Sequence, residues 1–313
     1  MKTDETPRTD PEPHGAGAVR YTTYLRLISK LDLNDDEAAM NVLSVLVALG
    51  VGGAVNEEAQ GYKRHPDIAY RTGAGADKER HVLDLYVPKG KKDFPTVLFV
   101  HGGTWKSGFK ELYAVLGQSL AADGIGCAIC NYRLSPKVQH PAHVEDVARA
   151  FAWTVENIGK YGGTKDRLFL CGHSAGGHLV SLLATDPQYL KAEQLGPANI
   201  KGVASFSGVY QIVHTEKVFE AAFGKDEKLC RLASPLTHVT GKCPPFLIAY
   251  ADTDFPQLDT MAENMCRALK KADSPFELVK CKNRNHYTII IQFIDSADPL
   301  NKSFREFVNK NCK

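Results

Sequence analysis

A serine between small residues is the first group in this chain whose setting indicates chemistry. Ser174 stands at the centre of Gly172-His-Ser-Ala-Gly176, which follows an apolar run and precedes a helical pattern over residues 177–184. A Gly-x-Ser-x-Gly run between a strand and a helix makes a sharp turn that exposes the serine hydroxyl. Backbone N–H groups and the dipole at the helix N-terminus stabilise developing negative charge there. The spacing predicts Ser174 as a nucleophile.

A second run could stabilise the negative charge that such a nucleophile creates on a carbonyl oxygen. The apolar stretch 96–100 leads directly into His101-Gly-Gly-Thr-Trp105. Glycine has no Cβ, so a substrate oxygen can approach its backbone N–H closely. We therefore expect the N–H groups of Gly102, Gly103 and Ala175 to form an oxyanion hole.

Side chains beside these glycines are candidates for other parts of the site. Trp105 and His173 are predicted to contact the substrate, although buried packing is an open alternative for Trp105. His101 is expected to brace the glycine loop rather than to act as a base.

The acid and the base are expected further along the chain, in that order. Two carboxylates, Asp252 and Asp254, follow an apolar strand candidate. Asp254 lies further past the strand end and precedes a proline-fixed turn, so it is predicted as the acid, and Asp252 as a capping or loop residue. His286 follows the next strand candidate and is the last histidine of the chain, which predicts it as the base.

Strand and helix patterns alternate from about Tyr62 onward. Such elements are needed to position the candidate catalytic residues. The strand candidates are 81–87, 96–100, 126–131, 168–171, 203–206, 246–250 and 276–279, and the helix candidates are 112–122, 144–158, 177–184 and 258–272. This alternation predicts an α/β fold with a mostly parallel central sheet of about eight strands and helices on both faces. Residues 61–313 are expected to form the catalytic domain.

The first 60 residues differ in composition from the rest. Residues 1–18 are rich in Pro, Gly, Asp and Thr and are predicted to be a disordered tail. The sequence pattern of residues 19–60 predicts an N-terminal helical extension or cap, which includes an apolar segment from Ala38 to Val55. Acidic flanks without basic or aromatic anchors favour a buried or site-covering helix there over a membrane contact.

Composition narrows the classes of partner and cofactor. The 38 basic and 36 acidic side chains give a net charge of +2, which offers no electrostatic case for nucleic acid. His140 and His143 have helical spacing, but no acidic or cysteine cluster joins them, so no metal site is predicted. No glycine-rich phosphate loop is visible, and no cofactor is expected. The expected partner is a small-molecule ester or amide, with a homodimer left open.

The cysteines and the N-terminus bear on the compartment. Eight cysteines at irregular spacing in a chain of 313 residues predict buried structural thiols rather than a disulfide scaffold or a zinc site. The chain starts with a polar, acidic stretch that lacks the apolar region of a signal peptide. Together these features predict a cytoplasmic protein.

Several short motifs in this chain resemble those of a known group of enzymes. They are His101-Gly-Gly-Thr-Trp105, Asn131-Tyr-Arg-Leu134, Tyr161-Gly-Gly163, Gly172-His-Ser-Ala-Gly-Gly-His178, Ala233-Ser-Pro-Leu-Thr-His238 and Asn285-His286. The chain resembles carboxylesterases related to kynurenine formamidase (arylformamidase), feruloyl-esterase-like proteins and, more distantly, hormone-sensitive-lipase-like esterases. Asn131 departs from the pattern, since an aspartate often stands there.

The resemblance extends from about Ile68 to the C-terminus. It implies an α/β-hydrolase fold. It also implies a catalytic triad and an oxyanion hole that consist of Ser174, Asp254, His286, Gly102, Gly103 and Ala175.

The predicted function is hydrolysis of short-chain or aryl carboxylic esters through an acyl-enzyme. An arylformamidase that hydrolyses N-formylkynurenine is the alternative, because the same triad serves both reactions. A catalytically silent, ligand-binding protein on the same fold is an alternative of another class. It is disfavoured because the nucleophile, the acid and the base are all present.

Overall fold

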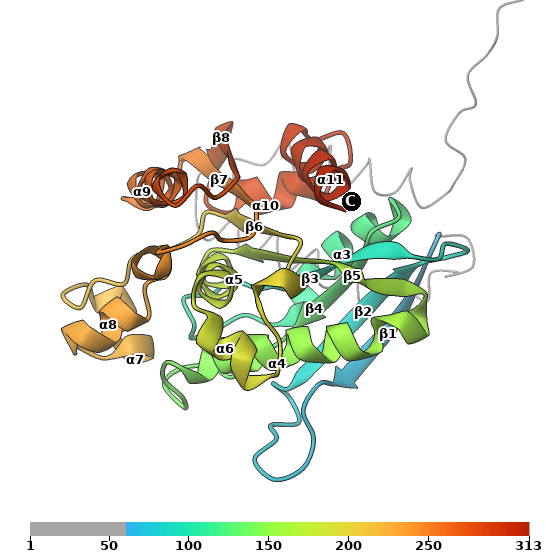
Figure 1. Ribbon diagram of the computed structural model, residues 1–313, viewed down its shortest axis with the longest axis horizontal. Coiled ribbons are helices and arrows are strands. Elements are labelled where there is room, and N and C mark those ends of the chain that lie inside the picture. Colours follow the sequence, from blue (N-terminus) through green and yellow to red (C-terminus); the bar gives the residue numbers. More distant parts are fainter. Residues whose placement is uncertain (1–60, 313) are drawn as a thin grey trace, which may run out of the picture.

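A computed structural model describes residues 61–312 of the chain. The predictions for residues 1–60, namely the tail, the helical extension and the apolar segment, lie outside the described residues. One eight-stranded sheet runs through the described part, in the order β1-β2-β4-β3-β5-β6-β7-β8 (Figure 1). The strands are β1 Tyr62–Ala69, β2 Val82–Pro88, β3 Phe94–Val100, β4 Gly126–Cys130, β5 Gly163–His173, β6 Gly202–Phe206, β7 Phe246–Thr253 and β8 Phe276–Asn285.

The sheet is antiparallel at one edge and parallel elsewhere. β1 pairs antiparallel with β2, and β2 pairs antiparallel with β4, whereas every pair from β4 to β8 is parallel. In a parallel sheet the carboxyl ends of the strands meet at one edge, which is where open α/β sheets bind ligands. The loops after β3, β5, β7 and β8 therefore converge, and these loops carry the predicted site residues.

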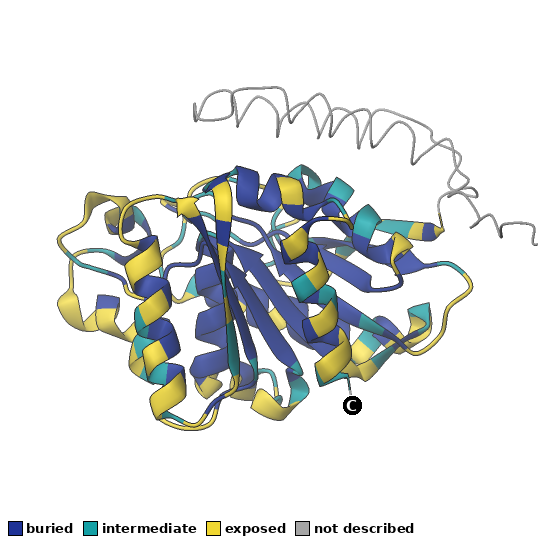
Figure 2. Cartoon of the chain, turned by 90° about the horizontal axis from the view of Figure 1, so that it is seen from above, coloured by how far each residue is buried: buried dark blue, intermediate teal, exposed yellow. Residues whose placement is uncertain are grey.

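Helices connect the strands and cover both faces of the sheet (Figures 1 and 2). They are α3 Ala114–Ala122, α4 Ala142–Asn157, α5 Ala175–Thr185, α6 Pro187–Ala192, α7 Lys217–Phe223, α8 Glu227–Leu232, α9 Leu258–Lys271, α10 Thr288–Phe293 and α11 Pro299–Asn311. Four short 3₁₀ helices complete the described connections, at Lys110–Tyr113, Ile158–Tyr161, Pro197–Asn199 and Pro235–His238.

Side chains of each central strand alternate between two hydrophobic cores. In β3, Leu98 and Val100 belong to the core under α4, α5 and α9, while Val97 and Phe99 belong to the core under α3, α10 and α11. Figure 2 shows these strands as a buried layer between the helices. A strand that is buried on both faces appears in the sequence as a continuous apolar run, so these strands could be predicted from the sequence.

The predicted fold class is confirmed. The α/β order, the number of strands and the helices on both faces match the expectation. Five helices were not predicted individually, α6, α7, α8, α10 and α11.

The thiols also match their prediction. All eight cysteines are free, and seven of them are buried. Cys127 and Cys130 lie on β4 and face opposite cores. Their thiols therefore neither form a disulfide with each other nor bind the same metal ion. Within residues 61–312, no helix has the length and apolar character that crossing a membrane requires.

Candidate active site

Ser174 occupies a strained turn between β5 and α5. Its backbone has φ 56° and ψ −120°, outside the regions that L-residues favour. The turn is possible because Gly172 and Gly176, two positions away on either side, lack side chains. A Cβ on Gly172 would lie 2.4 Å from the Gly176 carbonyl, and one on Gly176 would lie 1.9 Å from the Val100 carbonyl oxygen. The glycines let α5 pack directly against the ends of β5 and β3, which brings the serine to the carboxyl edge of the sheet.

Asp254 and His286 form a hydrogen-bonded pair after β7 and β8. The Nδ1 of His286 lies 2.6 Å from Oδ1 of Asp254. The other carboxylate oxygen, Oδ2, accepts hydrogen bonds from the Ser207 hydroxyl at 2.5 Å and from the Ala251 N–H at 3.0 Å. The Phe255 N–H also donates to Oδ1, at 2.9 Å, so four partners hold Asp254 in one orientation. The donor at Nδ1 of His286 leaves the second imidazole nitrogen free to accept a proton.

The surroundings keep Asp254 ionised. Burial alone would raise the pKa of this carboxyl group. The hydrogen bond and charge of His286, together with the Ser207 and Ala251 donors, outweigh burial and lower the pKa below its usual value. An ionised carboxylate beside an imidazole stabilises the imidazolium that forms when the base takes a proton.

Asp252, which the sequence predicts as a capping or loop residue, lies at the end of β7. It accepts the backbone N–H groups of Asn283 at 2.8 Å and Arg284 at 3.0 Å. These bonds attach the end of β7 to the end of β8. Asp252 therefore helps to fix the segment that carries His286 without touching the imidazole.

Aromatic rings hold the imidazole of His286 in place. Phe255 stacks on it, with ring centroids 4.1 Å apart and an angle of 22° between the planes. The ring of His173 lies 4.8 Å away, and Tyr287 approaches by its edge at 5.5 Å. Contacts of this kind limit rotation of the side chain, and a phenyl face also favours a cationic neighbour.

The loop after β3 adopts an unusual backbone over three successive residues. Gly103, Thr104 and Trp105 have φ values of 114°, 51° and 60°. A Cβ on Gly103 would lie 2.3 Å from the Ser107 carbonyl oxygen, so only glycine fits there. Such a loop presents backbone N–H groups rather than side chains, as an oxyanion hole requires.

One of the three predicted oxyanion donors already has a hydrogen-bond partner in the structure. The N–H of Gly102 donates to the hydroxyl of Tyr113 at 3.3 Å and is therefore already engaged. Gly103 and Ala175 remain as predicted donors. Ala175 is the first residue of α5, where a backbone N–H has no acceptor inside its own helix.

The substrate-binding role predicted for His173 is corrected. Its side chain is buried and does not line the cavity beside Ser174. Its Nδ1 lies 3.4 Å from the Tyr113 hydroxyl, and its Nε2 lies 2.8 Å from the backbone carbonyl of His286. Burial, aided by the charge of His286, lowers the pKa of His173 to about 3. A neutral ring that accepts from Tyr113 and donates to His286 links the oxyanion loop to the base.

Two more histidines brace the loop after β3. His101 donates from Nδ1 to the Gly102 carbonyl at 2.7 Å, and its ring stacks on Tyr132 at 4.4 Å, in keeping with the predicted bracing role. His178 was not singled out by the sequence. Its Nδ1 accepts the indole N–H of Trp105 at 3.3 Å, and its Nε2 lies 2.7 Å from the Ala233 carbonyl. Burial lowers the pKa of both His101 and His178 to about 3, so both remain neutral donors or acceptors.

Comparison with known proteins places the chain in a family. Residues 83–258 match the profile of the BD-FAE family, which is more than half of the chain. This chain belongs to the BD-FAE family. Esterase LipC of Mycobacterium tuberculosis is 32% identical over 201 residues, which are 57% of this chain and 49% of the relative. Kynurenine formamidase of Salmo salar is 28% identical over 256 residues, which are 78% of this chain and 82% of the relative. The chain thus spans about half the length of LipC.

Solved structures resemble this BD-FAE-family chain in fold. A truncated carbohydrate esterase from gut microbiota superimposes with a TM-score of 0.70 at 19% identity, covering 81% of this chain and 98% of that one. Esterase B from Lactobacillus rhamnosis gives a TM-score of 0.69 at 19% identity, covering 88% of this chain and 96% of that one. At such identities the likeness shows the α/β-hydrolase fold alone.

Ser174 and His286 line one cavity of about 310 Å³ in this member of the BD-FAE family. Its wall is mostly apolar, and Trp105 takes part in it although its side chain is almost fully buried. Buried packing, the alternative left open for Trp105, is therefore confirmed, while its contact with a substrate stays a prediction. The remaining lining residues are Thr104, Ala175, Val209, Val213, Glu216, Val218, Phe219, Phe255, Pro256, Gln257, Leu258 and Met261.

Three residues that the sequence did not indicate support this site. Tyr113, His178 and Ser207 act through hydrogen bonds to other site residues. His178 lies four residues after the serine, so its place on the first turn of α5 could have indicated it. Ser207 directly follows β6, and its position at the carboxyl edge is the one signal that the sequence offers. Within residues 61–312, no group of three or more metal-binding side chains is present.

Proposed function

We propose that this chain is a carboxylic ester hydrolase that uses Ser174, His286 and Asp254 in an acyl-enzyme mechanism. The observation that carries the proposal is the combination of a strained serine at the N-terminus of α5 and a hydrogen-bonded His–Asp pair beside the same cavity. Each of these features has a role in acyl transfer. Membership of the BD-FAE family and the relatives named esterases support the same reaction class.

The reaction begins when the Ser174 hydroxyl attacks the ester carbonyl carbon and its proton passes to Nε2 of His286. The carbonyl oxygen becomes an oxyanion, which accepts hydrogen bonds from the N–H groups of Gly103 and Ala175. The bond to the leaving alkoxide then breaks, and the alcohol departs with the proton from His286. Water repeats the sequence on the acyl-serine and releases the carboxylic acid.

The size and lining of the cavity support short-chain or aryl esters. Its volume of about 310 Å³ lies at the lower end of the range for small-molecule sites. Apolar side chains such as Val209, Val213 and Leu258 make up most of its wall. A small apolar acyl or aryl group gains most from such a wall, because burying it removes apolar surface from water.

Formamide hydrolysis is a second candidate. The observation that favours it is the similarity to kynurenine formamidase of Salmo salar, which extends over 82% of that protein. The amine that leaves an amide must be protonated before the C–N bond breaks, whereas an alkoxide leaves an ester more readily. The same serine, base and acid can serve both reactions. Rates on N-formylkynurenine and on p-nitrophenyl acetate, measured with the same preparation, decide between the two.

The Ser174→Ala variant tests the proposal. We expect kcat on p-nitrophenyl acetate to fall by a factor on the order of 10⁴–10⁶, because the nucleophile is lost while the oxyanion hole remains. The free energy of unfolding should change little, because alanine keeps the Cβ and the substitution removes only the hydroxyl group. Turnover retained by the variant would contradict the assignment of Ser174. Absence of turnover by the wild-type chain on every ester and formamide would instead favour a ligand-binding protein.

A further inference from the structure

The catalytic cavity carries an unbalanced negative charge. Among the described residues that line it, Glu216 is the one with a full charge, apart from the titratable base His286. Glu216 immediately precedes α7, yet its side chain makes no capping hydrogen bond to that helix. Within residues 61–312 its carboxylate also has no ion-pair partner, whereas Glu220, one turn later on α7, pairs with Lys225 at 3.0 Å. A carboxylate that the fold does not use is therefore presented to the substrate.

Three aromatic rings line the same cavity. They belong to Trp105, Phe219 and Phe255, and the Phe219 ring lies 5.8 Å from the Trp105 ring. Phe255 keeps 39% of its surface exposed although it stacks on the base. Aromatic faces carry partial negative charge and attract cations, most strongly alkylammonium groups. The rings and the carboxylate thus favour the same kind of ligand.

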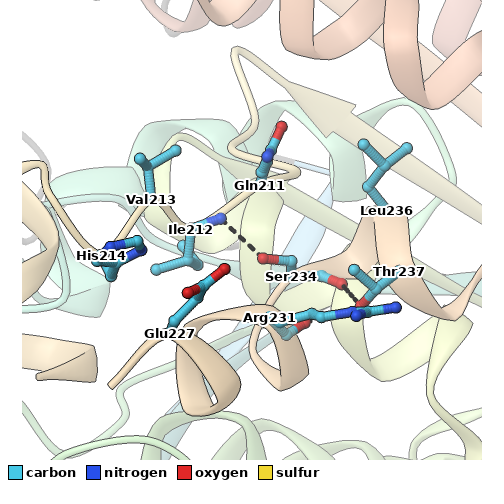
Figure 3. Close-up of a pocket in the computed structure, with 9 residues that line it drawn as sticks. All are labelled: Gln211, Ile212, Val213, His214, Glu227, Arg231, Ser234, Leu236 and Thr237. Atoms are coloured by element: carbon cyan, nitrogen blue, oxygen red, sulfur yellow. Dashed lines mark hydrogen bonds between the residues drawn. The ribbon is translucent and has the colours of Figure 1, made fainter. Parts of the chain in front are cut away.

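A second cavity of about 370 Å³ adjoins the catalytic cavity, and Val213 lines both. Figure 3 shows its charged side chains on α8, with the carboxylate of Glu227 below Ile212 and the guanidinium of Arg231 extending toward Thr237. This second cavity holds one carboxylate and one guanidinium, so its formal charges balance, unlike those of the catalytic cavity.

We propose that the site prefers esters that carry an ammonium group a few bonds from the scissile carbonyl, and that Glu216 selects them. This inference rests on the proposed ester hydrolysis. The chemistry is unchanged: water and the ester give the carboxylic acid and the alcohol, and the ammonium group takes no part in bond making. Its nitrogen faces the Glu216 carboxylate, and its alkyl groups contact the rings of Phe219 and Phe255.

The preference should be of moderate size, because Glu216 is exposed to solvent. Water screens an exposed pair, and measured contributions of such pairs are small, while an adjacent aromatic face adds a similar amount. We expect kcat/KM for the cationic ester to exceed that for its neutral analogue about tenfold.

The test compares two thioesters of the same shape. Acetylthiocholine carries a trimethylammonium group, and 3,3-dimethylbutyl thioacetate carries a tert-butyl group in its place. Thiol release from both is measured with the full chain and with Glu216→Gln, Glu216→Lys and Glu220→Gln. The last variant is the matched control, because it removes the same charge from α7 at a position outside the cavity.

The expected result is a wild-type ratio of about ten in favour of acetylthiocholine. Glu216→Gln should bring the ratio close to one, Glu216→Lys should bring it below one, and Glu220→Gln should leave it unchanged. Glu220→Gln should also retain the wild-type rate on p-nitrophenyl acetate. For the Glu216 variants the readout is the ratio between the two thioesters within one preparation, which cancels any general effect of the substitution on turnover. A wild-type ratio of one, or a ratio that does not respond to Glu216, would overturn the inference.

Two further outcomes separate this inference from the function on which it rests. Failure of the wild-type chain to hydrolyse p-nitrophenyl acetate would refute the proposed function itself. Preference for an ester with a free carboxylate, such as a succinate half-ester, would overturn the inference while leaving the function intact, and would assign selection to Arg231 in the second cavity.

Discussion

Asp254 receives hydrogen bonds at both carboxylate oxygens. One oxygen bonds to His286 and the other accepts from Ser207 and Ala251. These bonds have two effects, since they fix the direction of the carboxylate and favour its ionised form. Ser207 itself has φ 47°, a backbone conformation that is uncommon for serine. The fold therefore accepts local strain to place this hydroxyl 2.5 Å from the acid.

Replacing Ser207 by alanine should weaken the acid without removing it. The hydroxyl lowers the pKa of Asp254, so its loss raises that pKa and leaves Oδ2 with the Ala251 N–H as its remaining donor. We expect kcat to fall about tenfold, an effect of about 1.4 kcal/mol, which is typical of one hydrogen bond to a charged group. The loss should be larger at acidic pH than at pH 8, because more of the carboxyl group is protonated there. A pH profile of kcat/KM measures this.

Ser205→Ala is the matched control for that experiment. Ser205 lies on β6 two residues earlier, and its hydroxyl bonds to the Gly177 carbonyl at 3.2 Å rather than to Asp254. The control should lose stability without a change in the shape of the pH profile. Identical profiles for the two variants would show that Ser207 has only a structural role.

The residues that we propose as nucleophile, acid and base are the part of the site that the sequence indicates most directly. Ser174, Asp254 and His286 were assigned from strand ends and chain order, and the structure puts the last two in direct contact. The residues that were missed or misassigned, Tyr113 and His173, act through tertiary hydrogen bonds. Such partners are 60 residues apart in the chain, and no local pattern marks them.

At the scale of elements, the site depends on how closely α5 approaches β3. The α5 glycine Gly176 lies where a Cβ would be 1.9 Å from the Val100 carbonyl oxygen. β3 carries the oxyanion loop and α5 follows the nucleophile, so this contact sets the distance between them. A larger residue at this point must move one element away from the other.

Gly176→Ala should therefore destabilise the fold and lower activity together. We expect the free energy of unfolding to fall by about 3 kcal/mol or more, because the added methyl group meets backbone atoms that cannot move independently. Urea unfolding followed by circular dichroism measures the change, and the yield of folded protein serves if the variant does not fold. Gly159→Ala is the control, since a Cβ there meets nothing within 4 Å. An unchanged urea midpoint for Gly176→Ala would contradict this reading of the contact.

Sequence patterns predicted the long elements better than the short ones. The buried strands are continuous apolar runs, and helices α4 and α9 have periodic apolar faces over 16 and 14 residues. Helix α11, with 13 residues, is a long element that was not predicted. Helices α7 and α8 have only seven and six residues, too few for a period to stand out. They carry Val218, Phe219 and Arg231 to the cavities, so the substrate-facing wall was the part that the sequence left undetermined.

At the scale of the whole molecule, buried neutral histidines are a common feature of the interior. His101, His143, His173 and His178 are nearly or fully buried. Burial is the main cause that lowers the pKa to about 4 for His143 and to about 3 for the other three. Each would take up a proton at a higher pH in the unfolded chain than in the folded one.

This difference predicts a loss of stability in mild acid. In the unfolded chain these histidines protonate near pH 6.5, whereas in the folded protein they stay neutral down to about pH 4 or 3. The stabilising effect is thus complete above pH 6.5 and declines as the pH falls toward 4. Each histidine contributes about 1–2 kcal/mol to the difference between pH 7 and pH 5. Urea midpoints measured from pH 8 to pH 4 should fall in this window, and a midpoint that stays constant from pH 7 to pH 5 would contradict the prediction.

The hydrogen bonds that run from Gly102 through Tyr113 and His173 to His286 also constrain how this chain can evolve. Each of the two middle side chains serves a partner on either side of it, so a change at one leaves the other with an unsatisfied buried group. Substitutions at Tyr113 and His173 are thus expected to be epistatic rather than additive. Descendants should keep both or replace both, while residues of the cavity wall such as Val218 are free to diverge and to acquire new substrates.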